Sequence, residues 1–186
     1  MPPRLLPPLP APLTLPALQP YVRVIVAQRN FTTDPNKVFI LLVEEVGELT
    51  GEVAGAPARS AESSTALAHE VVDVLLYLVD LANGLEVELG RAWEAVPGPH
   101  APLNALAAAR RGADPAAALA ALWEATGRLA TLLRKRWKGL AAPEEAARTL
   151  AAAIDALLGI AGPAGIDLER AMVEKERLNA TRTWTY

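Results

Sequence analysis

Apolar residues recur along this chain at the three- and four-residue spacing of a helix. Leu18, Val22, Ile25 and Val26 form one apolar stripe, which predicts a helix over residues 18–29. The same spacing continues in three further segments and predicts helices over 36–53, about 65–84, and 86–95. An Asp-Pro pair before the second helix and an Asn-Gly pair after the third are ordinary start and stop signals. The pattern favours an all-α fold.

Two proline-rich stretches interrupt this pattern. Eight prolines lie within residues 1–20, and proline cannot sustain the helix of a signal peptide. We expect residues 1–17 to be a poorly ordered leader, with a polyproline ligand for a partner domain as the weaker alternative. Two further prolines lie within 96–100 and indicate a linker. The chain is thus divided into a leader (1–17), a first half (18–96), a linker (97–102) and a second half (103–186).

After the linker the helical pattern begins again. Asp114-Pro115 follows Asp34-Pro35 by 80 residues, and at an offset of 79 the segment 157–171 resembles 78–92. Four residues of 41–49 also recur 80 residues later: Leu42, Glu44, Gly47 and Leu49 return as Leu122, Glu124, Gly127 and Leu129. We predict a tandem duplication, in which two related halves of a helical bundle form a pseudo-dimer within one chain.

Composition restricts the class of protein. Hydrophobic residues make up 52% of the chain and aromatic residues only 5%, so the core is built largely from Ala, Leu and Val. A net charge of -3 gives no electrostatic case for nucleic acid or an anionic membrane as the main partner. The chain has no cysteine, which excludes thiolate metal sites and is compatible with the cytoplasmic location that we expect. The most apolar run, 71–82, contains two aspartates and is too short to span a bilayer.

Two acidic pairs lie within the apolar helices of the first half. Glu45 and Glu48 are three residues apart, as are Glu70 and Asp73, so each pair shares one helical face. If the two helices pack antiparallel, four carboxylates converge and repel one another unless a cation neutralises them. Ligation by oxygen alone suits Mg²⁺, or Mn²⁺ as an alternative. We therefore predict a metal site, the alternative being two ordinary solvated helix faces.

The acids do not recur in the second half. At the offsets of the repeat, Glu45, Glu48, Glu70 and Asp73 correspond to Ala125, Arg128, Thr149 and Ala152. The second half is expected to keep the helices and to lack the metal site. Arg128, in place of an acid, is expected to form an internal ion pair or to contact phosphate.

The acidic pairs and the C-terminal tail resemble those of a known family. Glu45-x-x-Glu48, 21 residues and Glu70-x-x-Asp73 resemble the signature of the MazG-like all-α nucleoside triphosphate pyrophosphohydrolases. The apolar surroundings of both pairs also resemble the family's motif helices. The family's common ending of Lys, then Asn and a basic residue before Trp, is matched by Lys175, Asn179, Arg182 and Trp184.

The resemblance implies a helical bundle that hydrolyses a nucleoside triphosphate to the monophosphate and pyrophosphate. It transfers the family's metal ligands to the four acids, with Mg²⁺ as the expected cofactor, and leaves open whether Glu45 or Glu48 orients the attacking water. The substrate is expected to be an NTP or dNTP, such as dUTP or a non-standard nucleotide. Candidate substrate contacts are Lys37, Lys175, Asn179 and Arg182.

The chain departs from the simple family pattern because the acids lie in the first half and the basic tail closes the second. We hypothesise one metal site, which the basic tail of the second half completes across the pseudo-twofold axis. The chain itself is expected either to stay monomeric or to pair again as a homodimer. A phosphoribosyl-ATP pyrophosphatase is a close alternative, because it uses similar paired acids. A helical regulatory or scaffolding protein without catalysis is the alternative from another class.

Overall fold

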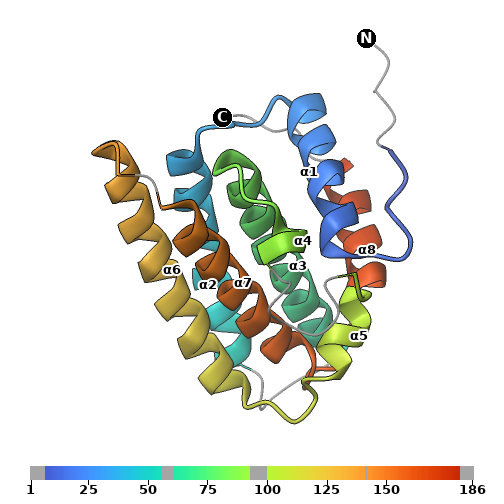
Figure 1. The fold of residues 1–186 in the computed structure, drawn as a ribbon. Helices are drawn as coiled ribbons and strands as arrows, with labels where there is room; N and C mark the ends of the chain where they lie inside the picture. The colour runs from blue at the N-terminus through green and yellow to red at the C-terminus, as the bar shows by residue number, and fades with distance from the viewer. Residues whose placement is uncertain (1–6, 56–60, 93–99, 141, 181–186) are drawn as a thin grey trace.

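The computed structural model describes residues 7–55, 61–92, 100–140 and 142–180, and all regular structure within these ranges is helical. The predicted all-α fold is confirmed (Figure 1). The helices of the described residues are α1 (Leu15–Arg29), α2 (Pro35–Ala54), α3 (Ala61–Gly84), α4 (Leu89–Ala92), α5 (Leu103–Ala108), α6 (Pro115–Trp137), α7 (Pro143–Ala161) and α8 (Leu168–Ala180).

Helix α1 begins inside the segment that was predicted to be a loose leader. Thr14 caps the helix by accepting a hydrogen bond from the Ala17 N–H, at 3.3 Å. Leu13 and Leu15 are buried, and the Leu13 N–H donates to Glu169 at 3.0 Å. The prediction of a poorly ordered leader is therefore wrong for residues 13–17, because burial of the two leucines fixes this segment against the bundle.

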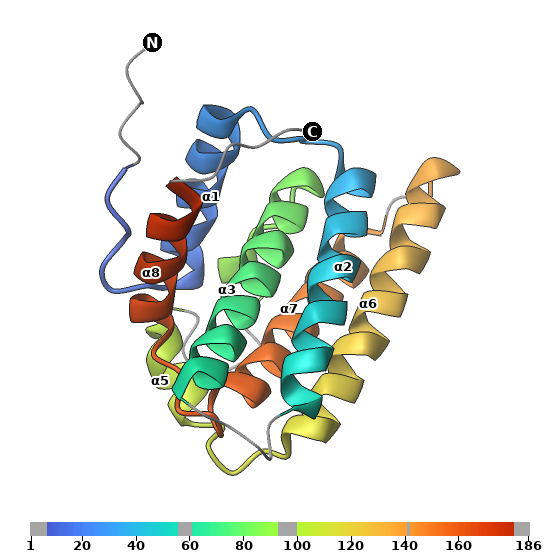
Figure 2. The same ribbon diagram turned by 180° about the vertical axis from the view of Figure 1, so that it is seen from behind.

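Four long helices form the centre of the bundle. The hairpins α2–α3 and α6–α7 each pack as antiparallel pairs, while α3 lies against α7 and α2 against α6. Figure 2 shows α3 between α2 and α8. Apolar residues at helical spacing fill the centre, including Leu42 and Val46 from α2, Val71 and Leu78 from α3, and Leu150 and Ile154 from α7.

The helix pairings are symmetric between the two halves. Helices α1 and α4 pack together, as do α5 and α8, and α1 lies on α3 as α5 lies on α7. The last helix of each half packs on the other half, α4 on α7 and α8 on α3. Exchanging α1–α4 with α5–α8 leaves the whole set of principal pairings unchanged. This packing brings the C-terminal helix onto the first half.

Local hydrogen bonds repeat at the sequence offsets of the predicted duplication. Asp34 and Asp114 accept from the N–H of Asn36 and Ala116, at 2.9 and 3.0 Å, and so cap α2 and α6 alike. The turns after α3 and α7 also share their backbone bonds: Glu86 N to Asn83 O and Val87 N to Ala82 O are matched by Gly165 N to Gly162 O and Ile166 N to Ala161 O.

In each half, a side-chain amide near the start of that half caps the last helix of the same half. Gln19 Oε1 accepts from the Leu89 N–H at 3.0 Å, and Asn104 Oδ1 accepts from the Leu168 N–H at 2.7 Å. Because Gln19 fixes the start of α4 at Leu89, the predicted helix over 86–95 is shorter at its beginning than expected, and its predicted end lies outside the described residues. The duplication itself stays a prediction, with which these matched contacts agree.

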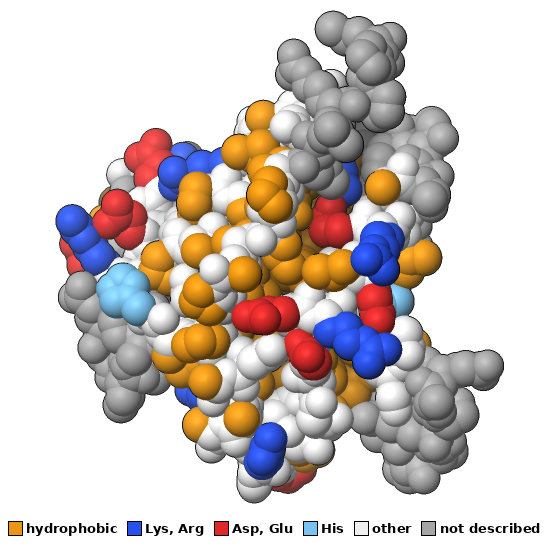
Figure 3. All heavy atoms as spheres, turned by 90° about the vertical axis from the view of Figure 1, so that its right-hand side faces the viewer, with side chains coloured by type: hydrophobic (Ala, Val, Ile, Leu, Met, Phe, Trp, Pro, Cys, Tyr) orange, Lys and Arg blue, Asp and Glu red, His pale blue; other side chains and the backbone are white. Residues whose placement is uncertain are grey.

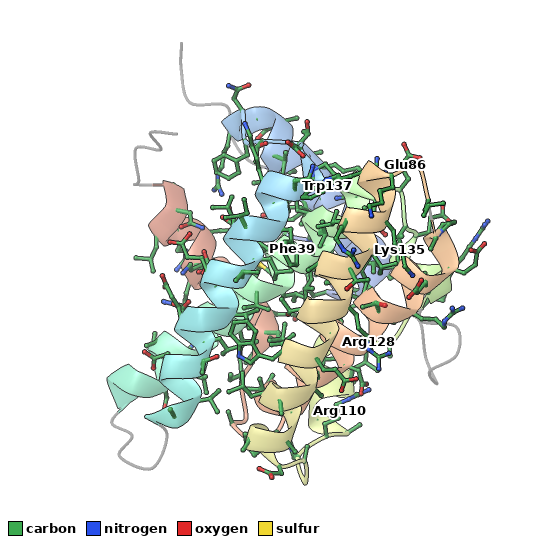
Figure 4. The ribbon with its side chains drawn as sticks, turned by 90° about the vertical axis from the view of Figure 1, so that its left-hand side faces the viewer. Phe39, Glu86, Arg110, Arg128, Lys135 and Trp137 are labelled. Atoms are coloured by element: carbon green, nitrogen blue, oxygen red, sulfur yellow. The ribbon has the colours of Figure 1, made fainter. Side chains whose placement is uncertain are left out.

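Two tryptophans join α6 to α2. Trp123 Nε1 donates to Thr50 Oγ1 at 3.0 Å, and Trp137 Nε1 donates to Asn36 Oδ1 at 2.7 Å. Trp137 lies at the end of α6 (Figure 4). Both rings therefore bridge the two halves of the bundle.

Candidate functional site

Three of the four predicted acids come together between α2 and α3. One carboxylate oxygen from each of Glu45, Glu70 and Asp73 lies within 4.8 Å of the other two. All three side chains are partly buried. The antiparallel packing of α2 and α3 produces this convergence, because it brings the acidic stripe of each helix to the same level. We call these three residues the acid cluster.

Glu48 lies at the edge of the acid cluster rather than in it. Its side chain is exposed, and it does not belong to the group of three oxygens. Its negative charge nevertheless contributes to raising the pKa of both Glu45 and Glu70. Its predicted role as a metal ligand stays a prediction.

The acid cluster holds more negative charge than its surroundings compensate. Burial and then the charge of Asp73 raise the pKa of Glu45 to about 8. Burial also raises the pKa of Glu70 to about 7, against the opposing effect of Lys175. Glu70 Oε2 is buried and has no hydrogen-bond partner among the described residues. Such a site gains stability from an additional cation.

Lys175 brings a positive charge from α8 into the acid cluster. Its ammonium group forms an ion pair with Asp73, and the two side chains are only 8% and 14% exposed. Lys175 reaches Asp73 because α8 packs on α3, across the boundary between the halves. On the face where α1, α5 and α8 lie, acidic and basic side chains are neighbours over an apolar surface (Figure 3).

The other predicted substrate contacts have different positions. Asn179 follows Lys175 by one turn of α8; it is buried, and its Oδ1 has no hydrogen-bond partner among the described residues. Lys37 is exposed near the start of α2. Arg182 lies outside the described residues. The structure thus brings Lys175 and Asn179, but not Lys37, to the acid cluster.

Two cavities lie beside α3, and only the smaller one is lined by residues of the acid cluster. The smaller, of about 110 Å³, is lined by Glu45 and Asp73 at one end and by Asp80 and Asn179 elsewhere. The larger, of about 550 Å³, reaches Lys37. Three residues line both cavities: Phe31, Tyr77 and Asp80. The two cavities therefore share one wall.

Helices α1 and α8 close the smaller cavity. Arg29 of α1 pairs with Glu176 of α8 at 2.7 Å, and the guanidinium carbon of Arg29 lies 5.9 Å from the centre of the Phe31 ring. Sequence reasoning missed Arg29, Glu176 and Asp80. Asp80 alone carried a signal, because it follows Asp73 by seven residues and so shares its helical face.

In the second half, a hollow lies at the positions that the predicted duplication pairs with the four predicted acids. Its volume is about 470 Å³, and its lining includes all four residues that correspond to the predicted acids: Ala125, Arg128, Thr149 and Ala152. Arg128 forms an ion pair with Glu124 at 2.6 Å, but both side chains are exposed, so the pair is not the internal one that was expected. Figure 4 shows Arg128 and Lys135 on α6. Among the described residues, only Glu45, Glu70 and Asp73 form a group with metal-ligand spacing.

Comparisons of the chain with protein-family models, with curated proteins and with solved structures give no significant match. The resemblance to the MazG-like pyrophosphohydrolases therefore depends on the residues quoted from the sequence. None of the described helices is long and apolar enough to cross a membrane.

Proposed function

We propose that this protein is a metal-dependent nucleoside triphosphate pyrophosphohydrolase, which converts an NTP or dNTP and water into the monophosphate and pyrophosphate. The observation that carries the proposal is the acid cluster with the buried ammonium of Lys175 beside it, at one end of a cavity. Glu45, Glu70, Asp73 and Lys175 are the residues that the sequence resemblance and the geometry have in common.

The acid cluster fits a hard divalent cation. It offers oxygen donors only, one of them buried without a hydrogen-bond partner among the described residues, and one ammonium group faces three carboxylates. Glu45, Glu70 and Asp73 would hold Mg²⁺ or Mn²⁺, with Glu48 at the edge. A bound Mg²⁺ supplies charge neutralisation at the phosphate oxygens and lowers the pKa of a bound water.

The protein's own side chains would bind and orient the substrate. Lys175 would contact the phosphate oxygens, because its ammonium already lies against Asp73. A water oxygen attacks the α-phosphorus, the bond to the bridging oxygen of the β-phosphate breaks, and pyrophosphate leaves. Glu45 or Glu48 would take the proton from that water. Asn179, with a free acceptor at the cavity, would contact the nucleoside.

We infer that the two halves form a pseudo-dimer with one such site. The symmetric helix pairings, the matched caps and the common hollow of the four second-half residues support this proposal. In this arrangement the first half supplies the metal ligands and the second half supplies Lys175 and Asn179.

The test is pyrophosphate release from a nucleotide panel that includes phosphoribosyl-ATP, with Mg²⁺ or Mn²⁺. We expect Glu70→Gln and Asp73→Asn to lower kcat/KM at least 100-fold while the helical circular dichroism signal is retained. Glu44→Gln is the matched control, because Glu44 is exposed on α2 beside Glu45 and outside the acid cluster. An absence of turnover, combined with no rise in melting temperature on adding metal, would favour the scaffolding alternative.

A further inference from the structure

Asp80 is a carboxylate at the shared wall of the two cavities that the proposed chemistry does not use. It is partly buried on α3, and it has neither a hydrogen bond nor an ion pair with any described residue. We propose that Asp80 selects the base of the nucleotide, by accepting hydrogen bonds from two adjacent N–H donors such as those of guanine. This inference rests on the proposed nucleotide pyrophosphohydrolase function.

The position of Asp80 matches that of a base when the phosphates lie at the acid cluster. Asp73, Tyr77 and Asp80 follow one another at intervals of four and three residues, so they share one face of α3. At 1.5 Å of rise per residue, Asp80 lies about 10 Å along the helix from Asp73. A nucleotide whose α-phosphate is at the acid cluster would extend its sugar and base by a comparable length along this face.

The cavities provide the remaining requirements of a base site. The larger one, of about 550 Å³, is within the range of pockets that hold small molecules. Phe31 and Tyr77 contribute aromatic rings to both cavities. Aromatic rings stack on all bases with little preference for one base over another. Because stacking is tolerant, discrimination between bases falls to polar groups, and Asp80 is the charged residue that lines both cavities.

The chemistry of a carboxylate indicates which bases fit. Burial raises the pKa of Asp80 to about 6, so it is mostly ionised at pH 7.5 and acts only as an acceptor. Guanine presents N1–H and the 2-amino group side by side and can bind a carboxylate through two parallel bonds. Uracil presents N3–H between two carbonyl oxygens, which repel the carboxylate. Oxidation of guanine at C8 leaves the two donors in place, so damaged guanine nucleotides also fit.

Turnover provides the first test. We expect wild-type kcat/KM for dGTP to exceed that for dITP, which lacks the 2-amino group, and that for dUTP by at least tenfold each. Asp80→Asn should reduce the dGTP/dUTP ratio by at least tenfold, because the amide replaces one acceptor with a donor. Glu88→Gln, a change to an exposed side chain between α3 and α4, is the control and should leave the ratio unchanged. An unchanged ratio in folded Asp80→Asn, or a wild-type preference for dUTP, would overturn the inference.

Nucleoside binding separates this inference from the proposed chemistry. Deoxyguanosine and deoxyuridine are titrated by NMR with EDTA present, so that neither metal nor phosphate contributes. Tighter deoxyguanosine binding that is lost in Asp80→Asn would support base selection even if no nucleotide is hydrolysed. The inference would be overturned if nucleotides are hydrolysed but neither assay shows a preference for guanine. It would also be overturned if the protein neither binds the nucleosides nor hydrolyses the nucleotides.

Discussion

Lys175 of α8 and Asp73 of α3 form a nearly buried ion pair, although they are far apart in sequence and belong to different halves of the chain. The pair exists because the last helix of each half packs on the third helix of the other. It places the positive charge of one half within the acid cluster of the other. We therefore expect stability and the proposed activity to depend on each other across the boundary between the halves.

Removing the ammonium group should expose this coupling. Lys175→Met leaves the acid cluster without its nearest positive charge, and loss of one partner from a buried pair costs about 3 kcal/mol. We expect urea unfolding at pH 8 without metal to show a loss of this size, partly recovered by added Mg²⁺. Lys135→Met is the control, because Lys135 pairs with Glu145 at 2.9 Å and the two side chains are 40% and 45% exposed. Such an exposed pair should contribute less than about 1 kcal/mol to the free energy of unfolding. Equal losses in the two variants would contradict the expectation.

The acid cluster should also make the stability of the metal-free protein depend on pH. The pKa values of Glu45 and Glu70 are raised to about 8 and about 7, from 4.5 in a solvated chain. The folded state therefore holds protons that the unfolded state releases. The contribution of these two groups to the free energy of unfolding is fully present below pH 4.5 and is lost as the pH rises through 7 and 8. Solvent screening of these partly exposed groups limits the loss to about 1 kcal/mol each. Urea titrations of metal-free protein between pH 6 and pH 9 should show the decline, and Glu45→Gln should reduce it. A flat profile in wild type would contradict the assigned shifts.

Metal binding should oppose that decline. A cation that binds only the folded protein stabilises it by about 2.7 kcal/mol at a hundred times its dissociation constant. We expect Mn²⁺ to raise the melting temperature of the wild type at pH 8, EDTA to reverse the rise, and Asp73→Asn to abolish it. Glu124→Gln should behave like wild type, since Glu124 is exposed and paired with Arg128 in the second half. An equal rise in Asp73→Asn would place the metal elsewhere.

The spacing of apolar and acidic residues along the sequence was enough to predict most of the helices and most of the acid cluster. Spacing alone predicted the helices and put Glu70 and Asp73 on one face, and the structure agrees. Spacing could not decide that Glu45 points inward while Glu48 is exposed, because residues three apart differ by about 60° around a helix, and the phase depends on the packing partner.

Contacts between distant segments were not predictable in the same way. The start of α4 depends on Gln19, 70 residues earlier, and the fixed end of the leader depends on burial of Leu13 and Leu15. The tail was expected to reach the acid cluster only through the family resemblance, and its partner, Asp73, came from the structure. Asp80 was missed although it shares a helical face with Asp73, because this spacing does not reveal the cavities that Asp80 lines.

The hollow in the second half offers a direct test of the proposed duplication. If Ala125, Thr149 and Ala152 correspond to Glu45, Glu70 and Asp73, then Ala125→Glu, Thr149→Glu and Ala152→Asp together should build a second cation site. The hollow of about 470 Å³ gives the larger side chains room, and its lining holds Arg128 and Arg148 together with Glu124 and Glu145. We expect equilibrium dialysis to show one additional Mn²⁺-binding site per chain in this variant, compared with wild type. The matched amide variant, Ala125→Gln, Thr149→Gln and Ala152→Asn, controls for side-chain volume and should bind no additional Mn²⁺. A folded acidic variant with unchanged Mn²⁺ stoichiometry would show that the proposed correspondence of positions is wrong.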